Sequence, residues 1–229
     1  MGDLVRLLQL VQFSDSALPV GAFTFSNGLE SAIQEGVVHD AGSLKAFVLA
    51  ATRQAATLDG VALLVAHRAA QAEDMGLIVA ADHAAHQRKL NEETRTMAVR
   101  MGRKLGELGE HIVRTRPLAD WMEMVRGRQA PGTFPIGLAL VTSGFDIDAR
   151  HAFAAHQYGV ASMILGAALR LMRITFLETQ AILFEVNATV EEAYEHIRTD
   201  TLDDMKGFAP AADILAAVHL KAHIRMFMN

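Results

Sequence analysis

Apolar residues recur at steps of three and four along most of the chain, which is the spacing of an amphipathic α-helix. The clearest set shares one face of residues 94–112 and comprises Thr94, Met97, Met101, Leu105, Leu108 and Ile112. The spacing repeats from Leu44 to Leu58, where Ser43 is placed to cap the helix by accepting a backbone N–H. Alternation with a period of two, which indicates a strand, is hard to find. The pattern therefore predicts an all-α protein.

Turn-forming residues divide the chain into roughly ten helices. They cluster at 15–19, 36–42, 87–91, 116–117, 129–135, 143–148 and 200–210, and residues 126–135 are expected to form the most mobile loop. A helix is expected from Pro19 into Glu30. Another should follow Thr189, where Thr189-Val190-Glu191-Glu192 has the form of a capping box. No linker is long enough to separate domains, so residues 1–229 are predicted to form a single-domain helical bundle.

Composition excludes several classes of function. The 229 residues are 51% hydrophobic and include no Cys, so disulfides and zinc–thiolate sites are excluded. A metal would have to be held by His, Asp or Glu. The net charge is −5 and the basic residues are scattered, which argues against a nucleic-acid partner. Protein partners are the better expectation.

Neither apolar stretch of the chain predicts export or a membrane span. The stretch from Leu7 to Phe13 is interrupted by Gln9 and Gln12, which makes a poor signal peptide. The nearly uncharged residues 157–169 are too few to cross a bilayer. A cytoplasmic protein that does not enter a membrane is expected.

Histidine pairs are the candidate metal ligands. His219 and His223 are four residues apart on a predicted helix and would share one face, as metal-binding pairs do. His83 and His86, three apart, could do likewise. No HExxH motif or carboxylate cluster supplies an obvious third ligand. Metal binding through His219 and His223, with His151 or His156 in support, therefore stays open.

No motif designates an active site or a cofactor. GxSxG and P-loop patterns are missing from the sequence, and Gly102, Gly106 and Gly109 more simply permit close helix packing. Glu30 follows an apolar segment, and an exposed helix acid is the expected state for it. The chain is therefore expected to be neither an enzyme nor a cofactor-binding protein.

The last residues of the chain differ from the other apolar segments. Met226, Phe227 and Met228 are three large apolar residues next to a chain end, where they are hard to bury in the protein's own core. A groove on a partner is the expected destination for them.

Three motifs resemble the UreF family of urease accessory proteins. The first is Leu18-Pro19-Val20-Gly21-Ala22-Phe23 followed by Gly28-Leu29-Glu30, and the second is Glu93-Thr94-Arg95 leading to Arg100-Met101-Gly102-Arg103-Lys104-Leu105. The third is the tail, from Phe208-Ala209-Pro210 to Arg225-Met226-Phe227. The motifs occur in the family's order and cover nearly the whole chain, so the chain is identified as a member of this family.

The resemblance implies a non-catalytic, all-helical scaffold. Such a protein dimerises, binds UreD (also called UreH) and recruits the GTPase UreG, so that nickel is inserted into the urease apoprotein. The resemblance also implies that GTP hydrolysis is modulated. The alternative function that stays open is a nickel-binding metallochaperone that uses His219 and His223, with His151 or His156 in support. The implied partner-binding residues are Phe23, Glu30, Arg225, Met226 and Phe227. The implied dimer interface includes Ala154, where some relatives have Arg, and Tyr158.

The chain departs from the family pattern after Leu171. Relatives commonly continue with Pro-Leu-Gly-Gln, whereas this chain reads Met172-Arg173-Ile174-Thr175-Phe176. The loss of Pro and Gly predicts a more continuous helix at this point.

Overall fold

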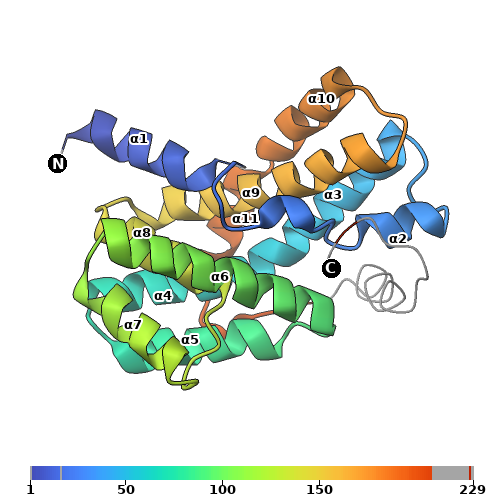
Figure 1. Cartoon of the computed structure of the whole chain (residues 1–229). Helices are drawn as coiled ribbons and strands as arrows, with labels where there is room; N and C mark the ends of the chain where they lie inside the picture. Colours follow the sequence, from blue (N-terminus) through green and yellow to red (C-terminus); the bar gives the residue numbers. More distant parts are fainter. Residues whose placement is uncertain (1, 16, 208–226, 228–229) are drawn as a thin grey trace.

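The chain folds into helices joined by short turns (Figure 1). The computed structural model describes residues 2–15, 17–207 and 227. In these residues there are eleven α-helices: α1 (Asp3–Ser14), α2 (Leu29–Gln34), α3 (Ala41–Ala55), α4 (Val61–Gln71), α5 (Met75–Gln87), α6 (Glu92–Ile112), α7 (Arg116–Arg126), α8 (Phe134–Gly144), α9 (Ala149–Leu171), α10 (Phe176–Asn187) and α11 (Val190–Ile197). The same ranges contain no strand. The prediction of an all-α protein of roughly ten helices is confirmed.

Helix α9 connects two hydrophobic clusters. The larger cluster lies among α4 to α8, where α8 packs against both α4 and α6. The smaller one forms where α2, α3 and α10 pack against the C-terminal half of α9. Helix α1 packs on α9 and extends past the end of the bundle (Figure 1). Side chains along α9 can therefore contact segments from both ends of the sequence.

The glycines of α6 allow close helix packing, as predicted. A Cβ added at Gly102 would overlap the backbone of residues 132–134, and one at Gly106 would overlap the Met122 side chain on α7. At Gly109 it would lie 2.8 Å from Val141 Cγ2 on α8. Because real Cβ atoms avoid such contacts, α6 approaches its neighbours only with glycine at these positions.

Two predicted helices begin with caps other than those expected. Asp40, not Ser43, is the N-cap residue of α3, and its carboxylate accepts a hydrogen bond from the Ser43 N–H at 2.7 Å. Helix α11 follows Thr189 as predicted, but the Thr189 hydroxyl donates to the Val186 carbonyl of the preceding helix. Both errors arise because a hydroxyl can bond to several nearby backbone groups, and only the local geometry decides which.

The expected helix from Pro19 to Glu30 is wrong for most of its length. Only the single turn η1 (Ala22–Thr24) precedes α2, which begins at Leu29. Gly21, Asn27 and Gly28 adopt left-handed backbone conformations, with φ of 87°, 52° and 82°. A right-handed helix cannot continue through such residues. The motif therefore forms a series of turns that direct the chain toward α9.

The predicted continuous helix across residues 172–176 is also wrong. Helix α9 ends at Leu171, and Met172 is extended, with φ −140° and ψ 166°. Thr175 then caps α10 in a reciprocal capping box with Glu178. The Thr-x-x-Glu signal starts a new helix here, so the break persists without the family's Pro and Gly.

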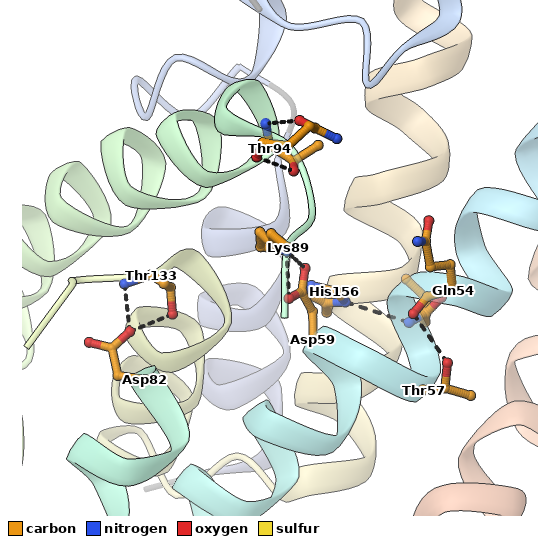
Figure 2. Close-up of polar contacts among 10 residues, drawn as sticks. Gln54, Thr57, Asp59, Asp82, Lys89, Thr94, Thr133 and His156 are labelled. Atoms are coloured by element: carbon orange, nitrogen blue, oxygen red, sulfur yellow. Dashed lines mark hydrogen bonds and ion pairs between the residues drawn. The ribbon is translucent and has the colours of Figure 1, made fainter. Parts of the chain in front are cut away.

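The loop at 126–135 is held by a buried carboxylate rather than left free. Asp82 on α5 is fully buried and accepts hydrogen bonds from the N–H groups of Gly132 and Thr133 at 2.8 and 2.9 Å. The Thr133 hydroxyl also donates to Asp82, at 2.6 Å (Figure 2). Trp121 Nε1 donates to the same carboxylate at 3.0 Å. Four donors stabilise the charge and fix the loop to α5.

Two helical stretches are long and apolar enough to cross a bilayer by length and composition, Ala41–Gln71 and Ala149–Leu171. Of their most apolar windows, 61% and 56% of residues are buried inside the protein. Core helices of a helical bundle show this pattern, so the protein's own packing accounts for their composition.

Candidate partner-binding site

Glu30 is buried against the end of the chain. Its side chain lies at the start of α2 and is only 4% exposed, so the expectation of an exposed acid is wrong. Its Oε2 accepts a hydrogen bond from the Phe227 backbone N–H at 3.2 Å. A carboxylate costs free energy to bury unless it is hydrogen-bonded, and this contact therefore joins two of the predicted site residues.

Arg170 joins the same two segments from α9. Its Nη2 donates to the Phe23 carbonyl oxygen at 2.9 Å, and its guanidinium lies 4.2 Å from the centre of the Phe227 ring. This stacking geometry is that of a cation–π contact. The sequence reasoning missed Arg170. The sequence feature that could have identified Arg170 is its position near the end of the longest apolar helix. An arginine at such a position usually only faces water.

Phe23 and Phe227 differ in exposure. Phe23 is 68% exposed, as a partner-binding aromatic residue must be. Phe227 is 4% exposed and packs in the smaller hydrophobic cluster, so the expectation that it could not be buried in its own chain is wrong. Arg225 and Met226, the other two predicted partner-binding residues, lie outside the described residues, as does Met228.

The two predicted dimer residues share a groove on another side of α9. Ala154 and Tyr158, one turn apart, line a groove of about 630 Å³ bounded by α1, α9 and the α10–α11 connection. Val11 on α1 is exposed and lines the groove itself. Other exposed apolar residues lie elsewhere on the two helices: Leu4, Leu7 and Leu8 on α1, and Phe176, Leu177 and Phe184 on α10. Apolar surface of this extent is typical of a protein–protein interface.

Two of the candidate metal ligands, His83 and His151, have other partners. His83 Nε2 lies 3.0 Å from the Gln129 carbonyl, and His151 pairs with Asp148 at 2.8 Å. Among the described residues, no group of three His, Asp or Glu side chains could hold a metal ion. His219 and His223 lie outside the described residues, so this pair stays a sequence-based hypothesis.

Fold and site together define an all-α protein in which the N-terminal motif and Phe227 converge around Arg170. The UreF family model matches residues 38–187. Over 227 residues, 99% of this chain, it is 58% identical to "Urease accessory protein UreF 2" of Brucella canis and 49% identical to "Urease accessory protein UreF" of Yersinia pestis. It covers 93% and 98% of those two proteins. The chain belongs to the UreF family of urease accessory proteins.

Proposed function

We propose that this protein is a non-catalytic scaffold for the maturation of urease. It forms a homodimer, binds UreD/UreH and recruits the GTPase UreG in the cytoplasm, so that nickel reaches the urease apoprotein. Modulation of GTP hydrolysis by UreG is part of this proposal. The observation that supports it best is the convergence of Phe23, Glu30 and Phe227, from opposite ends of the chain, on a single surface.

The surface around Arg170 is assigned to UreD/UreH. Phe23 supplies an exposed aromatic side chain, and aromatic residues carry much of the binding energy at protein interfaces. Glu30 and Phe227 are buried and act by fixing the backbone on either side of it. Phe227 therefore contributes by shaping the surface rather than by inserting into a partner.

The groove at Ala154 and Tyr158 is assigned to a second copy of the chain. Tyr158 is 39% exposed and lines the groove together with Leu10 and Val11 of α1 and Val190 of α11. Ala154 contributes only a methyl group to the groove, so apolar packing rather than an arginine contact at this position would supply the association energy in this protein.

A pair of substitutions tests the two assignments against each other. A tagged copy that carries Phe23→Asp should retain far less UreD from a cell extract that matures urease, while its mass in solution stays dimeric. Tyr158→Asp should give a monomer and keep the UreD-binding surface intact. Each variant is thus the control for the other. If the unchanged protein holds neither UreD nor UreG under conditions that support urease maturation, the scaffold function is wrong.

A further inference from the structure

A second apolar space lies under the N-terminal segment. It is a cavity of about 360 Å³, and its walls come from the segment between α1 and α2 and from α6, α8 and α9. Most lining side chains are apolar, including Phe13, Val20, Met97, Met101, Leu138 and Met163. Phe23 and Arg170 line it as well, so the cavity is continuous with the surface described above. Pockets of this size and character take small ligands or single side chains.

One polar side chain in the cavity wall stands out, His156 on α9. It is 2% exposed, and its Nδ1 lies 3.5 Å from the side-chain amide of Gln157 (Figure 2). In the amide orientation that satisfies both of its ends, Gln157 donates to the Thr52 carbonyl at 2.9 Å and accepts from the Ala56 N–H at 3.3 Å. This orientation turns the amide oxygen toward Nδ1, which then carries the ring proton, and leaves Nε2 as an acceptor.

The acceptor has no partner in the described part of the chain. No hydrogen bond reaches His156 Nε2 there. The carboxylate nearest in the wall, Asp59, is already paired with Lys89, which lies 2.7 Å from both of its oxygens (Figure 2). Burial lowers the pKa of His156, so the imidazole is neutral at pH 7. A second wall residue, Ser162, has a buried hydroxyl oxygen that is also without a partner in the described residues.

From these contacts we infer that the cavity is a binding site for a neutral aromatic group with one hydrogen-bond donor, the chemistry of a phenol or an indole. The apolar walls match the ring, and His156 Nε2 accepts from the O–H or N–H. A bound ligand shields this acceptor from water, which costs free energy unless the ligand supplies a donor, as a phenol or an indole does and a plain hydrocarbon does not. Beside His156 a cation finds no free carboxylate, because Asp59 is held by Lys89. The other carboxylate of the wall, Asp15, accepts a hydrogen bond from the Ala17 N–H.

Such a group can come from two sources, a free small molecule or a Tyr or Trp side chain of a partner. The second source rests on the proposed function, because the cavity adjoins Phe23, the residue assigned to UreD. The experiment therefore has one set of measurements without any partner and one with UreD.

The first measurement uses p-cresol, 3-methylindole and toluene with the full-length protein, followed by ligand-observed NMR and calorimetry. p-Cresol and 3-methylindole should bind roughly tenfold more tightly than toluene, which has nearly the size of p-cresol but lacks the donor. His156→Leu should remove this preference. The matched control is His111→Leu, which replaces an exposed histidine at the end of α6 and should keep it. Equal binding of all three molecules, or none by any, would overturn the inference.

A second variant guards against loss of the fold in His156→Leu. Gly159 also lines the cavity, and a Cβ added there meets nothing within 4 Å. Gly159→Leu therefore has room for its Cβ, and its larger side chain should occupy part of the cavity and abolish binding of p-cresol while circular dichroism is unchanged. Retained binding in this variant would place the ligand elsewhere and contradict the assignment.

The measurement with UreD distinguishes the sources. If a partner side chain is the ligand, saturating p-cresol and Gly159→Leu should each lower retention of UreD several-fold. Full retention of UreD together with tight p-cresol binding supports a free small molecule as the ligand. If the unchanged protein does not bind UreD at all, the proposed function fails, and the cavity is then judged by the binding measurements alone.

Discussion

Glu30 and Phe227, 197 positions apart in the sequence, are joined by a hydrogen bond from the Phe227 N–H to the Glu30 carboxylate. Arg170 completes the arrangement, since it contacts both the Phe227 ring and the Phe23 carbonyl. The N-terminal motif and the end of the chain therefore form one structural unit on α9. Changes in any of the three contacts are expected to affect both segments.

Arg170→Ala should release the end of the chain. Without the guanidinium, Phe227 loses its cation–π contact and the Phe23 carbonyl loses a charged donor. Together these losses should lower the equilibrium constant for the bound position of Phe227 roughly tenfold. Carboxypeptidase should then remove Phe227 faster, and retention of UreD should fall. The control is Arg173→Ala, an exposed arginine three residues further on. Similar digestion rates for both variants would show that Arg170 does not hold the tail.

Asp82→Ala should be among the most destabilising single substitutions. It leaves the N–H groups of Gly132 and Thr133 and the Trp121 Nε1–H buried without an acceptor. We expect the free energy of unfolding to fall by about 3 kcal/mol or more, measured by urea denaturation. Asp74→Ala, which removes only the exposed N-cap of α5, should cost about 1 kcal/mol. Equal losses in the two variants would contradict the role given to Asp82.

Two glycine substitutions should change stability in opposite directions. Gly102→Ala places a methyl group against the backbone of residues 132–134, which cannot move aside, and should destabilise the fold by about 3 kcal/mol. Gly166→Ala adds a methyl group where nothing lies within 4 Å and should stabilise α9 by up to about 1 kcal/mol. The midpoint of thermal unfolding should shift down for the first and up for the second. A neutral Gly102→Ala would mean that α6 and the loop can separate.

Stability should fall when the pH drops below about 6.5. Burial lowers the pKa of His67, His86 and His156 from the ordinary value of 6.5. Below pH 6.5 these histidines bind protons in the unfolded chain but not yet in the folded protein. The free energy of unfolding therefore falls as the pH drops from 6.5 toward the pKa values of the histidines in the folded protein. The midpoints of urea denaturation at pH 7.5, 6.5 and 5.5 measure this loss. Carboxylates with a lowered pKa, such as Asp40, titrate below this pH range and do not contribute to it.

His67 provides the specific test of this pH dependence. Its Nε2 lies 2.9 Å from the Ile147 carbonyl, and its Nδ1 is buried without a partner in the described residues. His67→Gln can keep the donor to Ile147 but cannot titrate, so the change of stability with pH should become smaller. The exposed His111→Gln, at the end of α6, is the control for replacing a histidine. An unaltered pH dependence in His67→Gln would assign the effect to other groups.

Much of the fold could be predicted from local signals. Helix α6 follows from the 3.6-residue apolar period, and its glycines mark the face that packs closely. The predicted helix caps at Ser43 and Thr189 were wrong, because each hydroxyl can form hydrogen bonds with more than one nearby backbone group. Local reasoning also failed at Pro19 to Glu30, where left-handed residues break the helix that the apolar pattern suggested.

The sequence by itself determined the helical class, the main breaks between helices and the motifs that identify the family, because these depend on residues close together in the chain. Only the tertiary structure decided that Glu30 is buried, that Arg170 contacts Phe23 and Phe227, and that His156 faces an apolar cavity. The reason is physical: these contacts join residues brought together by packing against α9. Their partners lie far away in sequence, and no local pattern of hydrophobic or polar residues encodes them.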